Sequence, residues 1–311
     1  MSKCLYCYNE VDSGLDYHEK CSESFFGTKT APVIEYTLGQ MSELAKDVVE
    51  RSVSVPGVQA KLSMSLMKET KNNSNNRLTV VGALGGNYIF KPPNKDFPQM
   101  PENEHLTMRI AKAFGINVVP SSLIKLKSGE LSYITKRVDR TDTGDKIHMI
   151  DMFQITEAFD KYKSSMEKIG KAIGLYTSNT LLDKLLFFEL TLFSFITGNN
   201  DMHLKNFSLI KTGYDWSLSP AYDLLNVFIL LPEDTDELAL SLEGKKKKFN
   251  REHFEVFAKK MNITSKQIEG VFKRFFKNKA KAIDLIENSF LSDELKLKYI
   301  ATIEERYLRL F

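Results

Sequence analysis

The most restrictive feature of this sequence is a cluster of polar residues between two apolar segments. Residues 196–210 read ITGNNDMHLKNFSLI and directly follow the apolar run LLFFELTLFSF. The polar members of the cluster are Asn199, Asn200, Asp201, His203, Lys205 and Asn206. One such residue is typical of a surface turn, but six of them between segments that look buried predict a functional loop held by the core.

Composition and charge limit the class of protein. The chain has 311 residues, of which 42% are hydrophobic, and this is enough for about two globular domains. Because 43 Lys and Arg residues nearly balance 40 Asp and Glu residues, the net charge is only +3, and neither nucleic acid nor a membrane is expected as a direct ligand. The lysine-rich runs at residues 244–249 and 273–281 are expected to be solvated surfaces.

The longest apolar run predicts a buried helix rather than a membrane span. It covers residues 185–198 and contains Glu189, and it is shorter than the ~20 residues that a spanning helix needs. The chain also does not open with a charged segment followed by an apolar one, so no signal peptide is expected. A cytoplasmic location is therefore expected.

All three cysteines lie within the first 21 residues. Cys4 and Cys7 form a C-x2-C pair, and His18 and Cys21 form an H-x2-C pair. Two close pairs joined by a short loop suit one tetrahedral zinc ion. The alternative is a reduced surface segment whose thiols have no ligand.

The order of apolar patterns predicts an α+β protein with a β-rich N-lobe and an α-helical C-lobe. The first part holds a helix at residues 41–50, strands at 78–84, 87–91, 118–126 and 131–140, and a helix at 102–115. From residue 151 the pattern is mostly helical, interrupted only near the polar cluster and up to about residue 223, and residues 250–311 are helical throughout. We therefore expect a zinc-binding segment at 1–30, an N-lobe at 31–145 and a C-lobe at 146–311.

The polar cluster fits phosphoryl transfer. A hairpin following it is expected to return Asp223 to the neighbourhood of Asp201 and Asn206, so that hard oxygen ligands for Mg²⁺ converge. An Asp followed five residues later by an Asn, then a hairpin and a second Asp, is the order found in protein kinases. Lys91 ends a strand like the lysine that binds ATP phosphates, and Glu102 or Glu104 could orient it.

Several segments together resemble the HipA family of bacterial serine/threonine kinase toxins. They are SVSVPGVQAKLSMSL, YIFKPP, ENEHLTMRIAKAFGINVVPSS, YITKRVDR, TGNNDMHLKNFSLI and LSPAYDLLN, between residues 52 and 226. The resemblance implies a bilobal protein-kinase-like fold, ATP and Mg²⁺ as cofactors, and an aminoacyl-tRNA synthetase as substrate. The residues do not indicate which synthetase.

The resemblance also implies residue roles. Asp201 and Lys91 would be catalytic, with His203 in the same catalytic loop as Asp201, while Asn206 and Asp223 would bind Mg²⁺. Val58, Gln59 and Lys61 would belong to a loop that holds the ATP phosphates. A hinge with Lys136, Val138 and Asp139 would receive the adenine, with Asp139 near the ribose. Autophosphorylation would occur at Ser54 or Ser52.

The chain departs from the family pattern in ways that bear on partners. It has no G-x-G-x-x-G loop, and it lacks the N-terminal subdomain of about a hundred residues found in full-length HipA proteins. It is similar instead to the short HipT-type toxins, which implies a small HipS-like partner and a helix-turn-helix antitoxin. Two other functions stay open: a small-molecule or lipid kinase, and a non-enzymatic DNA-binding regulator.

Overall fold

The computed structural model describes residues 2–51, 61–67, 76–81 and 85–311, and it divides into two compact units. The sheet unit comprises residues 1–105, 119–145 and 288–290. The helical unit comprises residues 106–118, 146–287 and 291–311. Each unit is described by itself.

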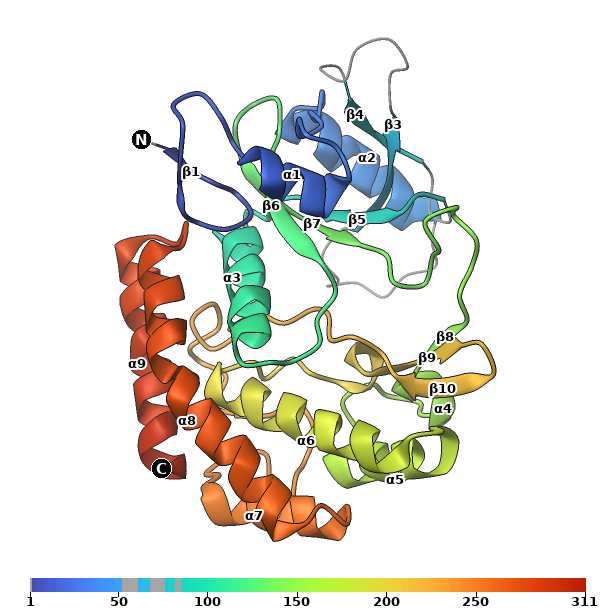
Figure 1. Cartoon of the computed structure of the whole chain (residues 1–311), viewed down its shortest axis with the longest axis vertical. Helices are drawn as coiled ribbons and strands as arrows, with labels where there is room; N and C mark the ends of the chain where they lie inside the picture. Colours follow the sequence, from blue (N-terminus) through green and yellow to red (C-terminus); the bar gives the residue numbers. More distant parts are fainter. Residues whose placement is uncertain (1, 52–60, 68–75, 82–84) are drawn as a thin grey trace. The chain divides into compact units, whose positions relative to one another are not determined.

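A five-stranded antiparallel sheet forms the centre of the sheet unit. Its strands are β3 (Leu62–Met67), β4 (Arg77–Val80), β5 (Tyr88–Lys91), β6 (Ser121–Lys125) and β7 (Leu131–Lys136), in the order β4-β3-β5-β7-β6 (Figure 1). The register places Phe90 opposite both Leu62 and Ile134, and all three side chains are buried. One face of the sheet is therefore core, and Lys91 lies at the end of its central strand.

Short elements complete the sheet unit. They are β1 (Ser2–Lys3), β2 (Glu10–Val11), α1 (Glu19–Phe26), α2 (Leu38–Arg51) and the start of α3 (Met100–Ala113). Pro92 and Pro93 follow β5, where a residue without an N–H cannot continue the strand ladder. Helix α3 is followed by Gly115 at φ +85°, a left-handed conformation that glycine adopts without strain.

The helical unit combines a small sheet with most of the helices. The strands β8 (Met149–Asp151), β9 (Ser208–Thr212) and β10 (Asp215–Leu218) pair antiparallel in the order β10-β9-β8. The remaining elements are α4 (Met152–Ile155), α5 (Met166–Tyr176), α6 (Thr180–Ile196), the 3₁₀ turn η2 (Leu204–Asn206), α7 (Arg251–Lys260), α8 (Ser265–Asn288) and α9 (Asp293–Leu310). None of the described helices has the length and apolar character required to cross a bilayer.

Helix α6 leads directly into the polar cluster. Every residue from Phe187 to Ile196 is buried, as expected of a helix that is apolar on all sides. Its aromatic side chains pack edge-on against neighbours from other elements, including Phe187 against Phe207 and Phe257. The start of the polar loop is thus anchored in the core.

Most predicted elements differ from the observed ones by a few residues at their ends, and three differences are instructive. Strand β7 ends at Lys136 rather than at residue 140; the chain turns at residues 138–139, where the Arg137 side chain donates to the Asp139 carboxylate. Residues 224–250, all of which are described, form turns and isolated bridges where mostly helix was expected. The predicted helical run 250–311 is three helices, interrupted at 261–264, where Asn262 has φ +65°, and at 289–292.

Candidate functional site

The asparagines of the polar cluster build the loop around Asp201. The side-chain oxygen of Asn199 accepts from the Asp201 N–H at 3.3 Å, and the amide nitrogen of Asn206 donates to the Asp201 carbonyl at 2.9 Å. The Asn200 amide donates to the Asp236 carbonyl at 3.0 Å. These bonds satisfy backbone groups that the loop would otherwise leave unpaired, so the loop is rigid for a structural reason.

Gly198 fixes the entry to the loop. Its φ is +66°, and a Cβ there would lie 2.8 Å from Oδ1 of Asn226. Its carbonyl accepts from the N–H groups of Val227 and Phe228 at 3.0 and 3.1 Å. Any other residue would be strained and would collide, which explains the glycine between α6 and the loop.

Asp201 has a partner that sequence reasoning missed. The hydroxyl of Tyr162 donates to Oδ1 of Asp201 at 2.7 Å, and its ring packs edge-on against His203 with centroids 5.0 Å apart. The adjacent Lys161 carbonyl accepts from the Leu204 N–H at 3.2 Å, which ties the Tyr162 segment to the loop. A tyrosine 39 residues upstream gives no local signal, because only the tertiary fold brings it there.

The imidazole of His203 is buried next to Asp201. Burial lowers its pKa, and this effect outweighs the opposing attraction of Asp201. Among the described residues, its Nδ1 has no hydrogen-bond partner. Burial therefore favours the neutral form of this imidazole, whose ring packs against Tyr162.

The segment Ala221–Asp223 is connected to the loop through Tyr222. The Tyr222 hydroxyl donates to the Lys205 carbonyl at 2.9 Å and lies 2.6 Å from the Ser208 hydroxyl. Burial raises the pKa of Tyr222, so it stays a neutral donor. The next residue, Asp223, adopts the left-handed conformation at φ +57°.

The donor set of this loop fits Mg²⁺. Because the amide nitrogen of Asn206 is bound to the Asp201 carbonyl, its Oδ1 is left as an oxygen ligand, and Asp223 supplies a carboxylate. The negative charge of Asp223 also acts on His203, which places the two in one electrostatic neighbourhood. The roles of Asn206 and Asp223 as magnesium ligands remain predictions.

In the sheet unit, Lys91 pairs with Glu104. The ammonium lies 2.6 Å from the carboxylate, and the two side chains are only 5% and 1% exposed. The ammonium also lies 5.3 Å from the centre of the Tyr133 ring. The structure thus selects Glu104 over Glu102, whose pKa burial raises to about 7.

The predicted nucleotide hinge has its own charge cluster. The carboxylate of Asp139 accepts from Arg137 at 2.9 and 2.7 Å and from Arg140 at 2.6 Å. Burial acts to raise the pKa of Asp139, and the two guanidinium groups outweigh it, so the pKa is lowered. If Asp139 binds a ribose, its carboxylate must do so while it also accepts from the two arginines. Lys136 and Val138 of the predicted hinge are partly exposed.

Most of the predicted phosphate loop falls outside the described part of the chain. Ser52, Ser54, Val58 and Gln59 lie outside the described residues, and Lys61, which is described, is exposed. Their roles therefore stay predictions.

The four predicted zinc ligands come together in the sheet unit. The Sγ atoms of Cys4, Cys7 and Cys21 and a ring nitrogen of His18 all lie within 4.8 Å of one another. Burial acts against ionisation of Cys4, but the amide N–H groups of Cys7, His18 and Tyr6 outweigh it and lower the pKa of this thiol to about 7. Burial, followed by repulsion from the other two thiols, raises the pKa of Cys21 to about 12. This cluster could hold a metal ion.

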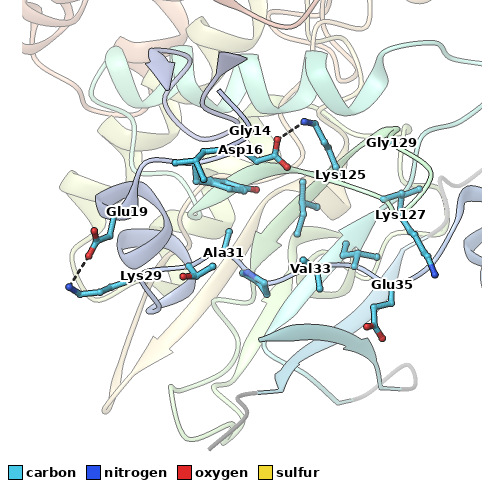
Figure 2. A pocket seen from close by; sticks show the side chains of 17 residues that line it. Gly14, Asp16, Glu19, Lys29, Ala31, Val33, Glu35, Lys125, Lys127 and Gly129 are labelled. Atoms are coloured by element: carbon cyan, nitrogen blue, oxygen red, sulfur yellow. Dashed lines mark hydrogen bonds and ion pairs between the residues drawn. The ribbon is translucent and has the colours of Figure 1, made fainter. Parts of the chain in front are cut away.

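A cavity of about 960 Å³ lies next to the cluster, within the sheet unit (Figure 2). Its wall includes Leu15, Val33 and Leu126, and Figure 2 shows the ion pairs Asp16–Lys125 and Glu19–Lys29 beside it. None of the predicted catalytic residues lines it.

The fold matches that of two kinases of known structure. The solved structure of HipA from Shewanella oneidensis MR-1, in a complex with HipB and operator DNA, superposes with a TM-score of 0.69, covering 88% of this chain and 72% of that one at 18% identity. The Helicobacter pylori proinflammatory kinase CtkA superposes with a TM-score of 0.54, covering 74% and 89% at 17% identity. The predicted mixed α+β, kinase-like fold is thereby confirmed.

The family follows from the sequence match. The HipA-like C-terminal domain matches residues 53–283, so this chain belongs to the HipA-like C-terminal domain family. It is 33% identical to the “Putative kinase Y4dM” of Sinorhizobium fredii over 69% of its length, and 24% identical to the serine/threonine-protein kinase toxin HipA of Shewanella oneidensis over 62%. The chain spans about half the length of these relatives, 55% and 47%.

Proposed function

We propose that this chain is an ATP- and Mg²⁺-dependent serine/threonine protein kinase. The observation that carries the proposal is the Asp201–Asn206 loop, in which the Asn206 amide holds the backbone carbonyl of Asp201 five residues earlier. This arrangement suits a catalytic aspartate, because the bond holds the Asp201 backbone and does not occupy its carboxylate. Membership of the HipA-like family and its kinase-named relatives supports the same reading.

The residues have distinct proposed roles. Asp201 orients the acceptor hydroxyl and accepts its proton, and Tyr162 holds one carboxylate oxygen so that the other can face the acceptor. The buried Lys91, aligned by Glu104, binds nucleotide phosphates. Asn206 and Asp223 would hold Mg²⁺, which when bound offsets negative charge on the phosphates.

The first test is Asp201→Asn. We expect phosphoryl transfer from labelled ATP to fall by about 10²–10⁴-fold, because the general base is lost while the loop keeps its backbone hydrogen bonds. Asp215→Asn, which changes an exposed aspartate in β10, is the matched control and should retain wild-type activity. Near-normal transfer by a folded Asp201→Asn protein would contradict the assignment.

The acceptor is proposed to be a protein, and specifically an aminoacyl-tRNA synthetase. Inactivating such an enzyme would stall translation, so the chain would act as the toxin of a toxin–antitoxin system. Phosphoproteomics after expression of wild type beside Asp201→Asn identifies the acceptor. Label on a small molecule or a lipid, with none on protein, would instead favour a small-molecule kinase.

Autophosphorylation at Ser54 or Ser52 is proposed as the off-switch of this kinase. A phosphate at the head of the phosphate loop would add about −1.5 to −2 charges and attract the same cations that bind ATP. Peptide mapping of active protein beside Asp201→Asn tests it. Active protein without phosphate on either serine would contradict it.

We further propose that the chain is a short HipT-like form that works with a small HipS-like partner and a helix-turn-helix antitoxin. The cavity bordered by the exposed side chains of Leu15 and Val33 supports a protein contact on the sheet unit. Pull-down from the native host is the test, and a chain recovered alone and monomeric would contradict the proposal.

A further inference from the structure

We propose that Cys4, Cys7, His18 and Cys21 bind one structural zinc ion, with His18 coordinating through Nδ1, and that this ion fastens residues 2–27 to the edge of the five-stranded sheet. This inference is independent of the kinase proposal.

The distances fit a tetrahedral site. With metal bonds of about 2.3 Å to sulfur and about 2.0 Å to nitrogen, a sulfur and a nitrogen ligand lie about 3.6 Å apart. Nδ1 of His18 lies 3.4 Å from Sγ of Cys7 and 3.7 Å from Sγ of Cys21. All four ligand atoms lie within 4.8 Å of one another, so small side-chain adjustments close the site around one ion.

The backbone presents the ligands from two rigid turns. Cys4 and Cys7 lie in the turn between β1 and β2, where the Cys4 N–H donates to the Asn9 carbonyl at 2.9 Å. His18 is the N-cap of α1, and the N–H of Cys21, in the first turn, donates to its carbonyl at 3.0 Å. A shared metal ion would join the two pairs.

The hydrogen bond on the far side of the imidazole assigns the coordinating nitrogen. Nε2 of His18 lies 2.8 Å from the Glu10 carbonyl, which can only accept, so Nε2 carries the proton. Nδ1 is then the lone-pair nitrogen, and it is the one that faces the thiols. A carbonyl orienting a histidine in this way is the usual second layer of a zinc site.

A redox pair is the main rival reading. Reactive C-x2-C pairs are typically activated at a helix N-terminus, with only two thiols. Here Cys4 and Cys7 lie in a hairpin turn, and the third thiol and the imidazole complete four ligands. Four protein ligands leave no position for a substrate, which makes the site structural rather than catalytic.

The contacts of the segment show what the ion would hold. On the edge strand β6, the Leu123 N–H donates to the Leu5 carbonyl at 3.3 Å, the Tyr17 hydroxyl donates to the Leu123 carbonyl, and Asp16 pairs with Lys125 (Figure 2). Residues 2–27 are too few to build a hydrophobic core of their own, so a metal ion would add to the stability that their contacts with the sheet supply.

Two further contacts reach the strand and helix that carry the Lys91–Glu104 pair. The Tyr8 hydroxyl lies 2.9 Å from Nδ1 of His105, the residue after Glu104. Phe25 packs against Tyr88, at the start of β5. Because three contacts of the segment are with β6, loss of the ion should loosen residues 2–27 and β6 first.

The primary test uses the unmodified protein. Elemental analysis of reduced, dialysed protein should give about one zinc per chain, and replacement by cobalt should give the intense visible bands and sulfur-to-metal charge transfer of a tetrahedral thiolate site. Nitrogen NMR should show His18 protonated at Nε2 and metal-bound at Nδ1. Zinc well below one equivalent after reconstitution, or a metal-bound Nε2, would overturn the proposal.

Variants test the role of the ion. Cys4→Ser with Cys7→Ser should lose the zinc, and hydrogen exchange should accelerate in residues 2–27 and β6 while β9 and β10 keep their protection. His148→Gln, at an exposed histidine outside the cluster, should keep full zinc. If the double variant does not fold, removing zinc from wild type with a chelator gives the same exchange measurement. Unchanged exchange in residues 2–27 without zinc would contradict the fastening role.

Discussion

At the scale of single residues, the polar cluster contains two kinds of side chain. The loop is held by hydrogen bonds between backbone groups and the side chains of Asn199, Asn200 and Asn206. Asp201 is held by its backbone, while its carboxylate accepts from Tyr162. Residue type alone does not separate the two kinds, because an asparagine and an aspartate in a loop look alike until their partners are known.

The Tyr162 contact leads to a prediction about turnover. In Tyr162→Phe the ring still packs on His203. Asp201 loses a charge-assisted hydrogen bond worth about 1.5–3 kcal/mol, and part of this free energy serves to position the carboxylate. We expect kcat to fall about tenfold while KM for ATP is unchanged, as measured by steady-state kinetics. Tyr214→Phe, at an almost fully exposed tyrosine in the hairpin turn, is the control. A variant with kcat within twofold of wild type would exclude a positioning role.

At the scale of elements, the irregular segment 224–250 has a charged anchor at Glu237 in addition to its buried apolar side chains. Glu237 lies 2.5 Å from Arg306 and 2.7 Å from Arg309, both on α9, and its carboxylate also accepts from the Phe249 N–H at 3.0 Å. The Arg306 side chain is 5% exposed. The segment therefore depends on partners that are far away in the sequence.

Removing this charge should destabilise the protein in a pH-dependent way. Glu237→Gln leaves the buried Arg306 and the half-buried Arg309 with only the exposed Glu305 as a carboxylate partner, and we expect a loss of about 3 kcal/mol in the free energy of unfolding at pH 7. Glu304→Gln, which breaks the more exposed pair with Lys279, should cost less than about 1 kcal/mol. Denaturant unfolding measures both, and equal effects would show that the Glu237 cluster contributes no more than a surface pair.

The pH dependence follows from the sign of the pKa shift. Burial acts to raise the pKa of Glu237, but Arg309, the Phe249 amide and Arg306 outweigh it, so the pKa is lowered in the folded protein. Its stabilisation is present above the unfolded pKa of about 4.3 and is lost as pH falls through the lower folded value. The difference between wild type and Glu237→Gln should therefore shrink in acid, and a constant difference would contradict this account.

At the scale of the whole molecule, nucleotide binding should stabilise the native state. A ligand at about 100 times its Kd stabilises by roughly 2.7 kcal/mol, which corresponds to a rise in Tm of roughly 5 °C for a chain of this size. We expect this rise with MgATP in wild type, and a much smaller one in Asp223→Asn or when magnesium is removed by EDTA. Thermal unfolding with ATP alone, with Mg²⁺ alone and with both gives the comparison. A rise that is independent of Mg²⁺ would argue against Asp223 as a metal ligand.

The sequence by itself determined the class of fold, the kinase-like order of Asp201, Asn206 and Asp223, and the Cys/His cluster. These features are local or ordered along the chain: apolar periodicity defines a strand or helix, and a C-x2-C pair sets its own spacing. Membership of the family could also be inferred, because the motifs that carry it are contiguous segments of sequence.

Only the tertiary structure decided which distant groups meet. Lys91 forms its ion pair with Glu104 and not with Glu102. Tyr162, 39 residues upstream, donates a hydrogen bond to Asp201. Glu237, in an irregular segment, pairs with two arginines on the last helix. The physical reason is the same in each case. A buried charge such as Lys91 must have a partner, and the more exposed Tyr162 hydroxyl also gains from one, but the packing of the whole chain determines which partner is near. Spacing along the sequence does not contain that information.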